Sequence, residues 1–253
     1  MAKIKSKKVI LFDLYQTLID IDIGGENKKR NEAKGWEFFA KSLEQYGVYI
    51  APAEFIALND TRREDFYVGK DKKIHHHHFC TLVARILKDD LHIEFSHGEI
   101  SSLVSKYHKI ARGHVRLYPG VVEVLARLQK QYILSTASYT QGCYTQPELK
   151  ELNIDQFFSY FIYTSDVGFQ KASPEFYKQC LEIVGKKAGD CVMVGDNYDV
   201  DVLVPQKLGI KAVWVKNPVT ANQYAHLFEQ EPQGMVNLDE FDKLPEVIER
   251  VFS

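Results

Sequence analysis

Residues 9–18, with the sequence VILFDLYQTL, combine an apolar run with one acidic residue. Four apolar residues, Val9 to Phe12, lead directly into Asp13, and the hydroxyl residue Thr17 follows four positions later. An apolar run of this length that starts with a β-branched residue predicts a strand buried on both faces, as in parallel sheets. Asp13 would then lie at the carboxyl end of the strand, where open α/β sheets bind their ligands. A carboxylate there needs a partner, so the position predicts a metal site, a catalytic site or a hydrogen-bonded turn.

The composition of the 253 residues is that of a soluble globular protein, since 45% are apolar and 26% are charged. The formal net charge of −2 lacks the strongly basic balance of nucleic-acid-binding proteins. The first apolar run is too short for a membrane span or a signal peptide. The four cysteines are scattered without a C-x-x-C pair, which favours reduced thiols over a disulfide framework. We therefore expect a cytoplasmic protein, monomeric or homodimeric, that binds neither nucleic acid nor a membrane.

Residues 31 to about 114 have apolar side chains at helical spacing and no alternating strand pattern, which predicts an all-helical insertion. The polar residues 20–30 predict the loop that leads into it. The segment contains four consecutive histidines, His75 to His78. Four adjacent side chains cannot share one helical face, so at most two could bind one metal ion, and a solvated helix face is the favoured interpretation.

From residue 118 onward, short apolar runs alternate with amphipathic stretches, which is typical of a parallel sheet wound with helices. We predict strands at residues 132–134, 161–163, 191–194, 211–215 and 235–238, and helices at 174–184 and 245–252. The predicted fold class is α/β: a doubly wound parallel-sheet (Rossmann-like) core formed by residues 1–20 and 115–253, with an all-helical cap at 21–114 inserted after the first strand. The cap leaves the sheet just beyond Asp13, so it can act as a lid over the ligand side.

Three of the predicted strands run into acidic or hydroxyl residues at their carboxyl ends. These are Asp13 with Thr17, Ser135 with Thr136, and Asp196 with Asp201. Parallel strands present these ends along one edge of the sheet, so the groups can converge there, and Lys171 joins them because it precedes the helix predicted from residue 174. A carboxylate nucleophile, further acids, hydroxyls and a lysine suit phosphoryl transfer through an aspartyl phosphate, with Mg²⁺ held by the acids.

The same residues lie in four segments whose order resembles the motifs of the haloacid dehalogenase-like (HAD) superfamily. Residues 12–18, FDLYQTL, resemble the first motif, D-x-D-x-T, with Tyr15 at the third position. Residues 133–138, ILSTAS, are similar to the second motif, and residues 167–176, VGFQKASPEF, resemble the third, G-x-x-K-P-x-P. Residues 192–201, VMVGDNYDVD, resemble the fourth, in which an apolar run is followed by G-D-x-x-x-x-D. The resemblance covers nearly the whole chain, with the helical insertion between the first and second motifs.

This resemblance implies a role for each matching residue. Asp13 would be the nucleophile, and Mg²⁺ would have as ligands Asp13, the backbone carbonyl of Tyr15, Asp196 and Asp201. The residues that bind the phosphoryl group or neutralise its charge would be Thr17, Ser135, Thr136 and Lys171. The insertion resembles the helical cap of the family, which selects the substrate. A small phosphorylated molecule is the expected substrate, and a phosphoprotein is also open.

Tyr15 stands where the phosphatases of the family usually carry their general acid–base aspartate. A phenol with a pKa near 10 is a poor base at neutral pH, and losing this function typically costs 10²- to 10⁴-fold in rate, which predicts a slow enzyme. Tyrosine at this position also resembles the 2-haloacid dehalogenases of the superfamily, which need no metal, whereas Asp196 and Asp201 resemble the metal-dependent phosphatases. The prediction is a Mg²⁺-dependent phosphatase; the alternatives are a 2-haloacid dehalogenase and a catalytically weak binding or regulatory protein.

Overall fold

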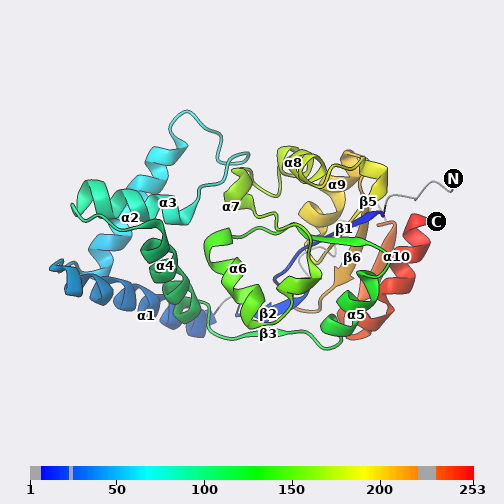
Figure 1. The fold of residues 1–253 in the computed structure, drawn as a ribbon, viewed down its shortest axis with the longest axis horizontal. Coiled ribbons are helices and arrows are strands. Elements are labelled where there is room, and N and C mark those ends of the chain that lie inside the picture. Colours follow the sequence, from blue (N-terminus) through cyan, green and yellow to red (C-terminus); the bar gives the residue numbers. More distant parts are fainter. Residues whose placement is uncertain (1–6, 23–24, 222–231) are drawn as a thin grey trace.

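A computed structural model describes residues 7–22, 25–221 and 232–253, which form a helical part and a sheet part (Figure 1). The helices are α1 (Gly25–Leu43), α2 (Pro52–Tyr67), α3 (Phe79–Arg85), α4 (His97–Ala111), α5 (Val121–Leu128), α6 (Gly142–Glu151), α7 (Thr164–Val167), α8 (Pro174–Val184), α9 (Val204–Lys207) and α10 (Leu244–Phe252). Short 3₁₀ turns are η1 (Glu44–Tyr46), η3 (Asp155–Phe157), η4 (Ala188–Asp190) and η7 (Leu238–Lys243), and π-helical turns are η2 (Ile86–Asp90) and η5 (Tyr198–Leu203).

The main sheet has five parallel strands in the order β4-β1-β5-β6-β7. Its strands are β1 (Val9–Phe12), β4 (Ile133–Thr136), β5 (Cys191–Gly195), β6 (Lys211–Lys216) and β7 (Gly234–Asn237). Helices pack on both faces of the sheet, so the predicted α/β fold class is confirmed.

The central strand β1 shows why both faces are covered. Side chains alternate along a strand, so Ile10 and Phe12 lie on one face, where they pack with α5 and α10. Val9 and Leu11 lie on the other face, where they pack with α8. All four side chains are fully buried, as expected for a strand in the middle of a doubly covered sheet.

Helices α1 to α4 form a body beside the sheet, drawn in blue to green in Figure 1. They share their own apolar cluster, which includes Phe39, Phe55 and Val104. Two short antiparallel strands, β2 (Ile19–Ile21) and β3 (Val115–Leu117), pair where the chain enters and leaves this body. The helices α1 to α4 therefore follow β1 and β2 in the chain and precede the other strands of the main sheet.

Two local predictions are wrong because long-range contacts override local composition. The loop predicted at residues 20–30 is partly strand and partly helix: β2 pairs with β3, and α1 begins at Gly25, while residues 23 and 24 lie outside the described residues. The strand predicted at 161–163 is an irregular segment that makes only isolated bridges, Ser135 with Tyr160 and Ser138 with Tyr163.

The prediction of a solvated helix face for His75 to His78 is also wrong. These residues precede α3 in an extended segment that lies against the core, where the His76 backbone N–H donates to the Gly168 carbonyl at 2.9 Å. The His76 ring is buried and stacks on Tyr139 with 4.8 Å between ring centroids. Within the described ranges, no helix is long and apolar enough to cross a membrane.

Candidate active site

A cavity of about 280 Å³ lies beyond the carboxyl ends of β1, β4 and β5. Asp13 follows β1 and Asp196 follows β5, and the Asp13 backbone N–H donates to the Val194 carbonyl at 2.9 Å. This hydrogen bond continues the β1–β5 ladder, so the two acids are carried by adjacent strand ends. The two acids therefore meet for the reason that the sequence predicted: they follow adjacent parallel strands.

The carboxylates of Asp13, Asp196 and Asp201 each offer an oxygen within 4.8 Å of the others. Asp201 reaches this group from η5, and a Cβ on Gly195 would overlap its carboxylate, so only glycine leaves room there. Burial, followed by the negative charge of Asp13, raises the pKa of Asp196 to about 7. Burial also raises the pKa of Asp201, to about 6. Closely spaced carboxylate oxygens that resist ionisation are a donor set that fits a hard divalent cation.

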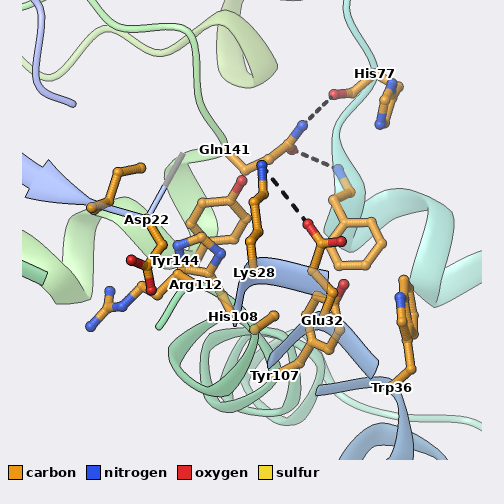
Figure 2. A pocket seen from close by; sticks show the side chains of 13 residues that line it. Asp22, Lys28, Glu32, Trp36, His77, Tyr107, His108, Arg112, Gln141 and Tyr144 are labelled. Atoms are coloured by element: carbon orange, nitrogen blue, oxygen red, sulfur yellow. Dashed lines mark hydrogen bonds and ion pairs between the residues drawn. The ribbon is translucent and has the colours of Figure 1, made fainter. Parts of the chain in front are cut away.

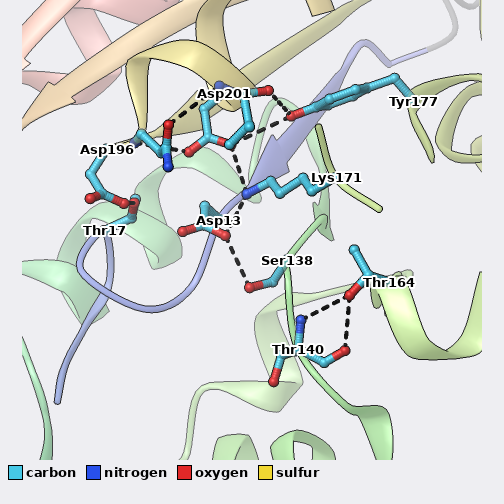
Figure 3. A network of polar contacts seen from close by, with 11 residues as sticks. Asp13, Thr17, Ser138, Thr140, Thr164, Lys171, Tyr177, Asp196 and Asp201 are labelled. Atoms are coloured by element: carbon cyan, nitrogen blue, oxygen red, sulfur yellow. Dashed lines mark hydrogen bonds and ion pairs between the residues drawn. The ribbon is translucent and has the colours of Figure 1, made fainter. Parts of the chain in front are cut away.

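Lys171 supplies the positive charge of this cluster, as Figure 3 shows. Its ammonium nitrogen lies 2.6 Å from Asp13 Oδ1 and 2.7 Å from Asp201 Oδ1, and the side chain is 3% exposed. Burial alone would lower the pKa of Lys171, but the two carboxylates outweigh it and raise the pKa. Lys171 is therefore a protonated, fixed cation that neutralises part of the charge on the three acids.

Further contacts fix the acids in place. The Thr17 hydroxyl donates to Asp196 Oδ1 at 3.1 Å, and the Trp214 indole donates to the Asp196 carbonyl at 2.8 Å. The backbone N–H of Asn197 donates to Asp201 Oδ2 at 3.1 Å. The resemblance placed Thr17 on the phosphoryl group; in the structure its fully buried hydroxyl orients an acid instead.

The hydroxyl that reaches Asp13 comes from Ser138, not from Ser135 or Thr136. Ser138 Oγ donates to Asp13 Oδ1 at 3.0 Å. Ser135 Oγ donates to the Thr136 carbonyl, and Thr136 Oγ1 accepts from the Ile162 N–H, so both are occupied inside the core. The predicted strand ended at residue 134, but β4 continues to Thr136, which is level with Phe12 of β1. Counting this register places the residue opposite Asp13 at 137, and the next hydroxyl is Ser138.

Tyr15 borders the cavity, but its hydroxyl is engaged elsewhere. The hydroxyl donates to Glu148 Oε2 at 3.2 Å and lies 3.2 Å from Thr145 Oγ1. Burial and the charge of Glu148 hold the pKa of Tyr15 well above its usual value. A phenol in this state donates a hydrogen bond and does not accept a proton, so Tyr15 cannot replace the aspartate as a general base.

A family model described as haloacid dehalogenase-like hydrolase matches residues 7–209. The chain belongs to this family. A glyceraldehyde 3-phosphate phosphatase of Methanocaldococcus jannaschii is 30% identical over 209 residues, covering 81% of this chain and 83% of the relative. One from Pyrococcus furiosus is 26% identical over 246 residues, covering 96% and 93%.

The solved structure of a 2-haloacid dehalogenase from Pseudomonas syringae shares the fold. Its TM-score is 0.64 at 22% identity, and the match covers 97% of this chain and 99% of that one. The family match, the parallel sheet and the acidic cluster at its edge agree with the HAD resemblance of the four sequence motifs.

Proposed function

We propose that this chain is a phosphatase that hydrolyses a small phosphorylated substrate through an aspartyl phosphate on Asp13. The observation that carries the proposal is the cluster of three buried carboxylates with a lysine bound to two of them. The relatives named glyceraldehyde 3-phosphate phosphatase support a small phosphate ester as the substrate class. Asp13, Asp196 and Asp201 would hold Mg²⁺, together with the Tyr15 carbonyl, and the ion would neutralise charge between nucleophile and phosphate.

The contacts around Asp13 support a role for each neighbouring side chain in the proposed reaction. Lys171 and Ser138 both bind Asp13 Oδ1, which fixes the carboxylate plane before attack. An Asp13 oxygen forms the bond to phosphorus, the bond to the leaving oxygen breaks, and water later cleaves the acyl phosphate. Lys171 keeps its charge throughout and stabilises the negative charge that gathers at phosphorus. Because the Tyr15 hydroxyl is engaged with Glu148, good leaving groups that need no proton should react fastest.

Divalent metal should control both turnover and stability. Chelation is expected to lower p-nitrophenyl phosphate hydrolysis about a hundredfold or more, because the metal supplies several kcal/mol of charge stabilisation. Mg²⁺ should also raise the melting temperature, and more at pH 8 than at pH 5.5. The pKa values of Asp196 and Asp201 are raised in the fold, so at lower pH they hold protons that the ion must displace.

The sign of this pH effect follows from the unfolded chain, where both carboxyls titrate near pH 4. Between about pH 4 and 7 the folded protein binds more protons, so these two groups contribute less stability as the pH rises. Bound Mg²⁺ offsets that loss at high pH. Scanning fluorimetry at both pH values measures the shift in melting temperature that Mg²⁺ causes. Asp196→Asn is the control that should not bind the metal. Equal shifts at pH 5.5 and pH 8 would contradict the carboxylate site.

The dehalogenase alternative keeps one specific observation in its favour, namely Tyr15 at the third position of the first motif. Phosphate release from p-nitrophenyl phosphate, with Mg²⁺ and with chelator, should be compared with halide release from 2-chloropropionate. We expect metal-dependent phosphate release and no halide. Metal-independent halide release without phosphate release would overturn the phosphatase, and silence in both assays with Mg²⁺ binding intact would indicate a binding protein.

Two serine variants test whether Ser138, which contacts Asp13 in the structure, or Ser135, which the sequence predicted, supports the reaction. Ser138→Ala is expected to lower kcat/KM about 10- to 100-fold, because a hydrogen bond to a charged group is worth about 1.5–3 kcal/mol. Ser135→Ala should change kcat/KM by less than about threefold, since its hydroxyl bonds only to the Thr136 carbonyl. Steady-state kinetics with p-nitrophenyl phosphate measures both. A larger loss in Ser135→Ala than in Ser138→Ala would restore the original assignment.

A further inference from the structure

A buried charged cluster connects Tyr15 to the last helix of the insertion. Its centre is Glu148 of α6, which is 1% exposed. Glu148 Oε2 accepts a hydrogen bond from the Tyr15 hydroxyl at 3.2 Å and is paired with Arg112, the C-cap residue that follows α4. His108 of α4 lies 3.6 Å from the same oxygen. One carboxylate oxygen thus joins the first motif, a core helix and the helical insertion.

Other contacts show that α4 and α6 are fitted to each other around this cluster. The His108 and Tyr144 rings stack with 3.5 Å between centroids, and Lys109 pairs with Glu151 at 3.0 Å. Figure 2 shows Arg112 and His108 beside Tyr144 at a pocket of about 340 Å³. The insertion therefore reaches the core at α6, one side chain away from Tyr15.

The buried ion pair at the centre is costly to form. Taking a carboxylate and a guanidinium out of water costs several kcal/mol for each ion, and well-packed apolar side chains would often be as stable. A contribution to stability therefore does not explain why Glu148 is charged. Its bond to Tyr15 does offer a reason, because α6 presents Thr145 and Glu148, one turn apart, to the same phenol.

We infer that Glu148 is a positioning residue, which holds Tyr15 at the wall of the Asp13 cavity and couples it to α4 through Arg112. The inference rests on the proposed phosphatase function insofar as the Asp13 cavity is the reaction site. When α4 lies against α6, Arg112 fixes Glu148, and Glu148 fixes Tyr15. Through these contacts, the position of Tyr15 at the cavity wall depends on how α4 packs against α6.

Two substitutions at one position separate positioning from stability. Glu148→Gln keeps an amide oxygen for the Tyr15 hydroxyl, whereas Glu148→Ala removes the carboxylate acceptor and leaves Thr145 Oγ1 as the neighbour of the phenol. Both leave Arg112 without its buried carboxylate, so both should lower the melting temperature. Only Glu148→Ala should lower kcat/KM for p-nitrophenyl phosphate about tenfold, the scale of one lost hydrogen bond to a charged group; Glu148→Gln should stay within about twofold.

Tyr15→Phe completes the test, since it removes the same hydrogen bond from the other side. If Glu148 acts through Tyr15, the double variant Tyr15→Phe/Glu148→Ala should be no slower than either single variant. Lys150→Ala is the matched control on α6, because Lys150 is an exposed side chain of the same helix, whereas Glu151 lies 3.9 Å from Arg112. Equal losses in Glu148→Gln and Glu148→Ala, or additive losses in the double variant, would overturn the positioning role.

Folding and activity need separate readouts. If Glu148→Ala does not fold, replacing Arg112 and Glu148 together by methionine removes the acceptor and the ion pair without leaving a lone buried charge. That pair should fold and show the same tenfold loss in kcat/KM. Amide hydrogen exchange of residues 14–18 should be faster in the variants that lack an acceptor at position 148 and unchanged in Glu148→Gln. This readout decides the role of Glu148 even if the wild type releases no phosphate, which would defeat the phosphatase proposal alone.

Discussion

If Asp13 is the covalent nucleophile, as proposed, Asp13→Asn is expected to lower phosphate release by a factor on the order of 10⁴ or more, because its whole reaction path is lost. An amide is too weak a nucleophile to attack phosphorus. The fold should survive, since Lys171 keeps its ion pair with Asp201 at 2.7 Å. One negative charge fewer also relieves the repulsion that raises the pKa of Asp196.

The measurement is p-nitrophenyl phosphate hydrolysis, with the melting temperature recorded for each variant. Asp199→Asn is the matched control, because Asp199 is an exposed acid in the same segment as Asp196 and Asp201. It should retain turnover within about threefold, as expected for a surface residue outside the cluster. Detection of phosphate bound to the wild-type protein in an acid-stable, hydroxylamine-sensitive form would place it on a carboxylate. An Asp13→Asn variant that kept more than about 1% of the rate would show that the carboxylate is not the nucleophile.

The part of the fold that could be predicted from sequence depends on local pattern. The apolar run Val9 to Phe12, and the runs that become β5 and β6, have few alternatives to buried parallel strands. Parallel strands end at the same edge of the sheet, so the strand pattern alone predicts that Asp13 and Asp196 lie close together. Lys171 could be added because it lies just before α8, and it does contact Asp13.

The errors concern features that depend on distant contacts. The choice between Ser135 and Ser138 depends on where β4 ends, and that is set by pairing with β1 more than 120 residues earlier in the chain. A polar stretch became β2 only because β3 lies opposite. His76 lies against Gly168 and Tyr139, two residues distant in the sequence that no pattern within the histidine run reveals.

Glu148 was not singled out from the sequence for the same reason. Its position in α6 is ordinary, and its significance arises from Tyr15 and Arg112, which belong to two separate, earlier segments of the chain. The first motif showed that an acid was missing at Tyr15. Only the structure shows that the tyrosine hydroxyl donates to a carboxylate. This contact concerns where the Tyr15 side chain is held rather than which group donates a proton.

Lys171→Met is expected to weaken both the fold and the reaction. Methionine has a similar length but no charge, so Asp13, Asp201 and Asp196 would share a buried space without a cation. Removing one partner of a buried ion pair typically costs about 3–5 kcal/mol, so the free energy of unfolding at pH 8 without metal should fall by about that amount. The loss of fixed positive charge beside phosphorus should also lower kcat on the order of 10²- to 10³-fold.

The pH dependence of this variant tests the electrostatic origin of its instability. Without Lys171, the Asn197 N–H offsets only a part of the burial and the neighbouring charge that raise the pKa of Asp201. The folded variant would hold protons to still higher pH than the wild type, so its stability should fall more steeply as the pH rises from 5.5 to 8. Mg²⁺ should restore part of the melting temperature but not kcat. Lys178→Met, an exposed lysine of α8, is the control and should change neither. Equal destabilisation at pH 5.5 and pH 8 would instead mean that Lys171 matters for packing, because protonation of the acids would then bring no relief.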